Sequence, residues 1–132
     1  MRATLLLSFL IVCAGPSWAQ KNAYEKSWSK VYKHELKDLT QSALDEVDAI
    51  YKKAKADKNS FQITKALIYQ SKFALTLEED AELLIVNRFK KEIGESKFPH
   101  KNILESMLAS IYWQHFQENR WRYYNRSQTD EK

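Results

Sequence analysis

The side chains with the most evident chemistry are three histidines, which lie on three separate segments of the chain: His34, His100 and His115. None of them has a second histidine or a cysteine three or four residues away, and His34-Glu35 does not continue as H-E-x-x-H. Zinc sites on helices need such spacing, because side chains three or four residues apart share a helix face. The sequence therefore predicts no metal site and no bound cofactor.

Acidic residues gather at Glu78, Glu79, Asp80 and Glu82. Such a cluster could supply paired carboxylates for acid–base chemistry or a cation site. However, its spacing is not that of a calcium loop, and the helix dipole favours acidic residues at a helix amino terminus in any case. Phosphate loops and nucleophile elbows need clustered glycines, and Gly94 is the only glycine after residue 15. We expect no enzymatic activity; catalysis by dispersed carboxylates such as Glu79 and Glu82 is the alternative.

Cations and aromatic rings alternate near the carboxyl end of the chain, over residues 119–126. This composition is typical of a surface that stacks nucleic-acid bases, and also of a hot spot in a protein interface. Because the apolar amino terminus at residues 3–14 predicts export, we interpret the segment as a protein-docking face and expect no nucleic-acid partner. Asn125-Arg126-Ser127 also fits a glycosylation acceptor, although such matches are common by chance. The candidate docking residues are Trp113, Arg120, Trp121, Arg122, Tyr123 and Tyr124.

The elements that must position these residues are helices. From residue 22 onward, apolar residues recur at intervals of three and four, which is the period of an amphipathic helix. The pattern predicts five helices with short connections, so that consecutive helices are antiparallel neighbours. The expected core residues are Tyr24, Trp28, Val31, Leu39, Ala43, Val47, Ile50, Tyr51, Ala54, Ile63, Ala66, Leu67, Phe73, Leu77, Ala81, Leu84, Ile85, Phe89, Ile93, Ile103, Leu104, Met107, Leu108, Ile111, Tyr112 and Phe116.

Capping residues mark the expected helix ends. Asn59, with Gln62 three residues later, would cap the third helix, and Thr76 with Glu79 would open the fourth. Gly94 is a natural stop for the fourth helix, because glycine readily adopts the left-handed conformation of a helix end. Pro99 suits the first turn of the fifth helix.

One internal similarity relates the third and fifth predicted helices. The pattern A-x-I-Y-x-x-x-F occurs at 66–73 and again at 109–116, a shift of 43 residues. Such a shift suits a unit of two helices, and the pattern resembles tetratricopeptide-type hairpins, although these repeat nearer 34 residues. Chance agreement between two amphipathic helices is the alternative. We predict an all-α fold of antiparallel helical hairpins, stacked as a short TPR-like α-solenoid.

The composition supports this fold class. The 132 residues are 44% hydrophobic, 29% charged and 13% aromatic, with a formal net charge of +4, which suits one folded domain. Only two glycines and two prolines occur, whereas sandwiches and barrels need turn residues about every 8–12 positions. The composition therefore argues against both β architectures.

The amino terminus has the three-part layout of a secretory signal peptide. A positive start at Arg2 is followed by an apolar run over 3–14, and small residues then stand at Ser17 and Ala19. The apolar run is shorter than the roughly 20 residues that a transmembrane helix needs. We therefore predict cleavage between Ala19 and Gln20. The expected parts are a signal peptide (1–19), a helical-repeat domain (20–124) and a polar tail (125–132), the last interpreted as a truncated continuation.

The single cysteine bears on the cellular compartment. Cys13 lies within the apolar run. Lipoprotein signals attach lipid to such a cysteine but usually have Gly, Ala or Ser before it, where this chain has Val12; lipidation is the alternative. Cleavage leaves no thiol, and hence no disulfide, in the mature chain. We expect an exported protein, in the periplasm, at the cell surface or secreted, that meets the membrane only through its signal peptide before cleavage.

Several stretches of the predicted helices resemble a known family. They are S-A-L at 42–44 with I-Y-K-K-A-K at 50–55, K-A-L-I-Y at 65–69, and I-Y-W-Q at 111–114 with N-R-W at 119–121. They are similar to the helical amino-terminal region of large bacterial alpha-2-macroglobulin-like proteins. The resemblance covers nearly all of the chain after the signal peptide.

The resemblance implies a place in a family of protease inhibitors. Its members entrap proteases after a bait segment is cut, and many carry a thioester built from a Cys-x-Glu-Gln motif, which this chain lacks. The chain would be the non-catalytic leading part of such an inhibitor. It would serve scaffolding or docking on downstream domains or an envelope partner, and would meet proteases only through the missing domains. The alternative is a free-standing exported helical-repeat adaptor that binds a peptide or protein.

Overall fold

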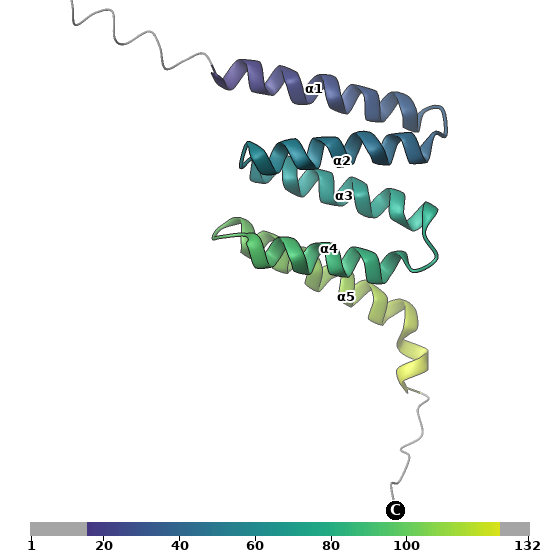
Figure 1. Ribbon diagram of the computed structural model, residues 1–132. Coiled ribbons are helices and arrows are strands. Elements are labelled where there is room, and N and C mark those ends of the chain that lie inside the picture. Colours follow the sequence, from purple (N-terminus) through teal and green to yellow (C-terminus); the bar gives the residue numbers. More distant parts are fainter. Residues whose placement is uncertain (1–15, 125–132) are drawn as a thin grey trace, which may run out of the picture. The chain divides into compact units, whose positions relative to one another are not determined.

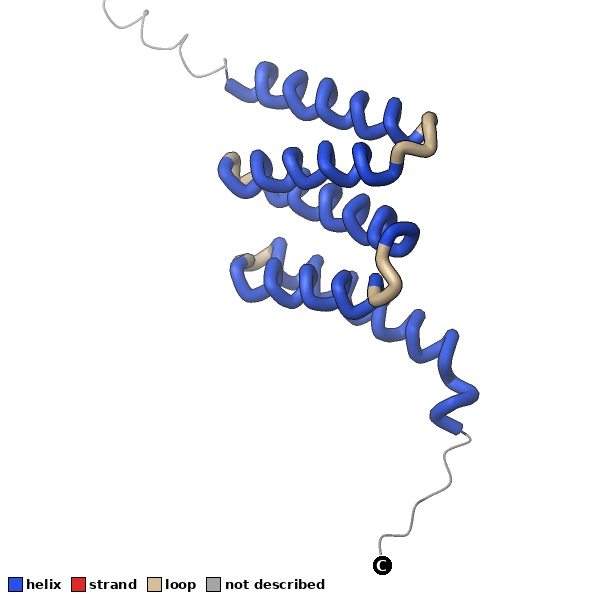
Figure 2. The backbone as a smooth tube through the Cα atoms, turned by 45° about the vertical axis from the view of Figure 1, so that its right-hand side comes forward, coloured by secondary structure: helices blue, strands red, loops and turns tan. Residues whose placement is uncertain are grey.

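A computed structural model of the chain describes the backbone of residues 16–124 and the side chains of residues 23–122 and 124. Within this range the protein is all-helical and has no strand, which confirms the predicted fold class (Figures 1 and 2). The helices are α1 (Pro16–Glu35), α2 (Thr40–Ala56), α3 (Ser60–Leu77), α4 (Ala81–Glu95) and α5 (His100–Tyr124). Most of the predicted signal peptide, with Cys13, and the tail 125–132 lie outside the described residues. No described helix is both long and apolar enough to span a bilayer.

The first three helices form one compact unit. α2 packs against both α1 and α3, and the three helices run in alternating directions, as an antiparallel arrangement requires (Figure 1). Both turns are short because each helix ends in a Schellman motif. In these motifs Asp38 and Lys58 adopt φ of 55° and 53°, while the next residues, Leu39 and Asn59, donate their backbone N–H to carbonyls five residues back.

The last two helices form the second unit, in which α4 packs against α5. Its core combines apolar side chains with a polar cluster. Glu92 and His100 are buried, and between them Ser96 donates to Glu92 Oε1 (3.4 Å) and lies 3.2 Å from His100 Nδ1. A buried carboxylate costs stability unless it is hydrogen-bonded, so the bond from Ser96 reduces the cost of burying Glu92.

Most of the expected core is buried, but four of its members are exposed: Leu39 (46%), Leu77 (39%), Ile103 (52%) and Tyr112 (45%). Leu39 lies in the turn between α1 and α2, and Leu77 is the last residue of α3. Ile103 and Tyr112 lie on the flanks of α5, beside the stripe that packs on α4. The prediction was wrong at these four positions because periodicity identifies a face but not its edges or ends. Tyr51, Leu84, Ile93, Met107, Ile111 and Phe116 are half-buried.

The predicted cap of α3 is confirmed. Gln62 donates its backbone N–H to Asn59 Oδ1 at 3.2 Å. The Gln62 side chain does not return the bond as in a full capping box, because its Oε1 accepts a hydrogen bond from Trp28 Nε1 at 2.7 Å. The side chain that should close the box instead joins α1 to α3.

Two predicted helix ends of the second unit were wrong. Thr76 lies inside α3, and α4 begins only at Ala81, after Asp80, so Thr76 and Glu79 form no capping box. Gly94 lies within α4, which runs to Glu95, and it has no positive φ. Pro99 directly precedes α5 and accepts at its carbonyl the N–H of Ile103.

The internal repeat has a different register from the one the sequence indicated. Ala66 is buried whereas Ala109 is exposed, so the 43-residue shift matches unlike positions. Buried positions instead recur after 41 or 42 residues. A shift of 43 residues differs from a shift of 41 by two residues, and two residues turn a helix by about 200°. The pattern matched at 43 therefore compares nearly opposite faces of the third and fifth helices. The pairs with like burial are Ile63 and Leu104, Leu67 and Leu108, Ala43 and Ile85, and Val47 and Phe89.

Candidate docking surface on α5

One face of α5 packs on α4. Its buried residues, His100, Leu104 and Leu108, follow one another at intervals of four. Ile111 and His115 continue this stripe and are half-buried. His115 Nδ1 also contacts Glu82 Oε2 of α4 at 2.7 Å, an ion pair when the imidazole is protonated. Because residues at this spacing share one side of a helix, the opposite side of α5 has no contact with α4.

The opposite face carries part of the predicted docking set. Trp113 lies nine residues, or two and a half turns, from Leu104, and Arg120 and Tyr124 follow it at intervals of seven and four. Trp113 is 62% exposed, Tyr124 is 77% exposed and Arg120 is exposed as well. These three residues therefore share a solvent-facing surface, which we call the α5 outer face.

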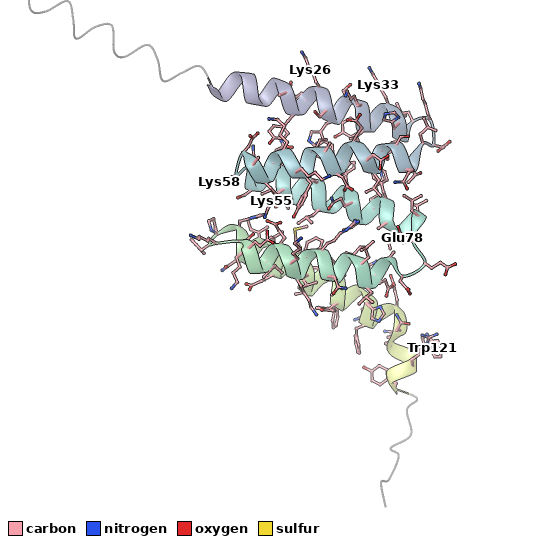
Figure 3. The ribbon with its side chains drawn as sticks, viewed as in Figure 1. Lys26, Lys33, Lys55, Lys58, Glu78 and Trp121 are labelled. Atoms are coloured by element: carbon pink, nitrogen blue, oxygen red, sulfur yellow. The ribbon has the colours of Figure 1, made fainter. Side chains whose placement is uncertain are left out.

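The remaining predicted residues lie around this face. Trp121 is 59% exposed, flanks the α5 outer face and projects away from the helix in Figure 3. Arg122 lies on the opposite side of α5 from Trp113, so it was wrongly grouped with the others, although it too is exposed. The Tyr123 side chain lies outside the described residues. The structure thus brings three of the six residues together and places a fourth beside them.

Contacts along α5 hold these rings in place. Trp113 stacks on Phe116, with ring centroids 5.8 Å apart and planes at 28°. The Arg122 guanidinium lies 5.1 Å from the centroid of Trp121, a cation–π distance. A ring that is already held loses less rotamer freedom when a partner covers it. The exposed parts of Trp113, Trp121 and Tyr124 together amount to roughly 400 Å² of aromatic surface, comparable to the largest apolar patch on a typical monomer, which is often functional.

No family model, curated protein or solved structure matches this chain. The resemblance to alpha-2-macroglobulin-like proteins, the expected export and the expected lack of catalysis therefore stay predictions.

The other candidate sites do not converge. The three histidines are separated: His34 is half-buried on α1, His100 is buried beside Ser96, and His115 pairs with Glu82. Among the residues that the structure describes, no group of three or more histidine, cysteine or carboxylate side chains could hold a metal ion. The acidic cluster is exposed, with Glu78 to Asp80 before α4 and Glu82 in its first turn. Ala19 and Gln20, the two residues that flank the predicted cleavage site, lie in the first turns of α1.

The first unit holds an aromatic and basic cluster that the sequence analysis missed. Lys65 Nζ lies 4.0 Å from the centroid of the Trp28 ring and donates a hydrogen bond to Tyr32 Oη at 3.0 Å. Tyr69 completes the cluster, with ring centroids 4.9 Å from Trp28 and 6.1 Å from Tyr32. The signal was present as two pairs at spacing four, Trp28 with Tyr32 and Lys65 with Tyr69. Nothing in one sequence shows that α1 and α3 bring these pairs together.

The cluster changes the acidity of its two phenols in opposite directions. The hydrogen bond from Lys65 lowers the pKa of Tyr32 below its ordinary value of 10.0, and the hydrogen bond from Tyr69 lowers it further. The same bond to Tyr32, together with burial, raises the pKa of Tyr69 to about 12. These directions are the ones expected when the Tyr69 hydroxyl donates and the Tyr32 oxygen accepts.

A third phenol, that of Tyr24, ties α1 to the end of α2. Tyr24 is 2% exposed, and its hydroxyl donates to Asp57 Oδ2 at 2.7 Å. Burial, followed by this hydrogen bond, raises the pKa of Tyr24 above its ordinary value of 10.0. Lys53 Nζ pairs with the same carboxylate oxygen at 3.0 Å, so Asp57 is held by both helices.

Proposed function

We propose that this chain is an exported, non-catalytic helical module that docks onto protein through the α5 outer face. The observation that carries the proposal is the exposure of Trp113, Arg120 and Tyr124 on one side of a helix whose other side is buried. Tryptophan, tyrosine and arginine are the residue types that contribute most to protein interfaces.

The area of the exposed rings on and beside this face indicates what the partner must supply. Burying about 400 Å² of aromatic surface contributes roughly 10 kcal/mol at 25 cal/mol per Å². Association itself costs an estimated 4–15 kcal/mol in lost freedom of motion. The rings alone therefore do little more than balance that cost. A partner that also places carboxylates against Arg120 would gain the affinity that the rings do not provide.

We further propose that the module is the leading part of an alpha-2-macroglobulin-like protease inhibitor. The support is the resemblance in the sequence of α2, α3 and α5, together with the all-helical fold. In this function the α5 outer face docks on downstream domains or on an envelope partner. The module itself neither binds nor cuts a protease.

The second candidate is a free-standing adaptor that binds a peptide or protein. A specific observation favours it: α3 carries exposed apolar residues at intervals of seven, Phe61 (72%), Ile68 (46%) and Leu75 (64%). Residues at that interval lie along one stripe, which suits an amphipathic partner helix.

Two experiments test the proposal. The first is to read the gene after the codon for Lys132: bait and thioester domains there support the inhibitor module, and a stop codon supports the adaptor. In the second, the chain is produced together with any downstream domains, the connection is cut, and association of the two parts is measured. We expect Trp113→Ser/Tyr124→Ser to abolish association and Phe61→Ser, the matched control on α3, to leave it unchanged. Association that survives the double substitution would overturn docking through the α5 outer face.

A further inference from the structure

The Tyr32 hydroxyl oxygen has an environment unlike that of an ordinary surface tyrosine. It accepts a hydrogen bond from the Lys65 ammonium at 3.0 Å and another from the Tyr69 hydroxyl. Both donors stabilise the oxygen as it gains negative charge, because hydrogen bonds to the charged form favour that form. A phenol activated in this way is a better nucleophile, since the phenolate rather than the phenol attacks.

The donors are held in place by their own contacts. Lys65 Nζ lies over the Trp28 ring at 4.0 Å, and its distances to the ring centroids of Tyr32 and Tyr69 are 5.5 and 5.8 Å. Trp28 is itself fixed by the hydrogen bond from its Nε1 to Gln62. Contacts with three rings favour this position of the cation and so help to keep the ammonium beside the Tyr32 oxygen.

The one nearby charge that opposes activation is paired. Glu35, at the end of α1, raises the pKa of Tyr32 through its negative charge. Its carboxylate forms an ion pair with Lys72, about two turns beyond Lys65 on α3. The ion pair offsets part of that opposing charge, and the net direction for Tyr32 remains downward.

We propose that the Tyr32 hydroxyl is a nucleophilic acylation site that takes an acyl group from an activated acyl donor. Tyr32 is 39% exposed, so a small donor can reach it from solvent. The phenolic oxygen forms a bond to the acyl carbon while the bond from that carbon to the leaving group breaks. The departing group takes up the proton that the phenol loses, and the product is a tyrosine ester. This site is independent of the proposed docking function of α5.

The test compares tyrosines within the intact chain. The purified protein is treated at neutral pH with a limiting amount of N-acetylimidazole, and acetylated residues are mapped by mass spectrometry of peptides. Hydroxylamine removes acetyl groups from tyrosine esters but not from lysine amides, so it identifies the tyrosine products. Exposure alone ranks Tyr124 (77%) and Tyr112 (45%) ahead of Tyr32 (39%). We expect the opposite order, with Tyr32 acetylated first. If Tyr124 and Tyr112 react first, the proposal is wrong.

Substitutions then identify the cause. Lys65→Met removes the ammonium but keeps a long side chain, and we expect it to slow acetylation of Tyr32 by about tenfold, to below the rate of Tyr124. Tyr69→Phe keeps the ring but removes the second donor and should slow it by a smaller factor. Lys52→Met, at an exposed position of α2 away from the cluster, is the matched control and should change nothing. A Tyr32 rate unaffected by Lys65→Met would overturn the proposal. Circular dichroism confirms that each variant is folded. The order in which the tyrosines of the unsubstituted chain are acetylated tests the proposal without any variant.

Discussion

Two tryptophans of the same chain offer a matched test of which parts of the structure are core and which are surface. Trp28 is 4% exposed, donates a hydrogen bond to Gln62 at 2.7 Å and lies 4.0 Å from the Lys65 ammonium. The substitution Trp28→Ala removes the ring, leaves a cavity between α1 and α3 and deprives Gln62 of its donor. Large-to-small core changes of this kind cost about 3–5 kcal/mol of the free energy of unfolding.

Trp113→Ala is the same substitution on the α5 outer face. Trp113 is 62% exposed, and its aromatic contact is the stack on Phe116 one turn away. Losing that stack costs about 0.5–1 kcal/mol. Alanine is the better helix former by a few tenths of a kcal/mol, which offsets part of the loss. We expect a net change in unfolding free energy within about 0.5 kcal/mol of zero.

Urea and thermal unfolding, followed by circular dichroism at a helix wavelength, measure both values. For a domain of this size 1 kcal/mol shifts Tm by about 4–8 °C, so Trp28→Ala should lower Tm by more than about 12 °C and Trp113→Ala by less than about 4 °C. If Trp28→Ala fails to fold, Trp28→Phe keeps most of the ring and should cost about 1–2 kcal/mol through the lost hydrogen bond. A loss of 2 kcal/mol or more for Trp113→Ala would show that the ring is part of the core and would refute the docking face.

Three further predictions address other parts of the chain. Lys58→Gly, in the turn after α2 (Figure 3), should raise the unfolding free energy by about 0.5–1 kcal/mol, because its φ of 53° strains any residue that has a side chain. Lys52→Gly, inside α2, is the control and should lower the unfolding free energy by about 1 kcal/mol. A loss of stability in both variants would refute strain at Lys58. Because the folded-state pKa of Tyr24 is raised, the contribution of Tyr24 to stability is complete below the ordinary value of 10.0 and is lost as the pH rises above it. The urea midpoint of unfolding should therefore fall as the pH rises above 10, and it should fall less steeply in Tyr24→Phe. Equal slopes of midpoint against pH in the two proteins would contradict this. Amino-terminal sequencing of the exported protein should begin at Gln20, whereas a start at Met1 or a lipid on Cys13 would contradict cleavage there.

The sequence was sufficient for the helices because their apolar residues recur so regularly. It also located the cap at Asn59, since a capping side chain acts on its own helix three residues away. The prediction failed where other interactions outweighed the local sequence rule for ending a helix. Gly94 continues a helix instead of ending it, and the two left-handed turn positions are Asp38 and Lys58, where no glycine signals a turn.

The candidate site was only partly readable for a similar reason. Spacing places Trp113, Arg120 and Tyr124 on one side of a helix and Leu104 and Leu108 on the other, and both leucines are buried as expected. Composition also grouped Arg122 with the docking residues, although it lies on the opposite side of α5 from Trp113. The cluster around Lys65 could not be found at all, because it depends on the register of α1 against α3, which no periodicity within either helix encodes.

The most direct test of docking through the α5 outer face is site-specific photocrosslinking in the cell that produces the protein. A photoreactive phenylalanine analogue replaces Trp113 in one variant and Lys52, an exposed residue of α2, in the other. After irradiation, cross-linked peptides are identified by mass spectrometry, which detects both separate partners and domains of the same polypeptide. We predict one defined protein partner at position 113 and none at position 52. Absence of cross-links at position 113, or the same products at both positions, would contradict the proposal.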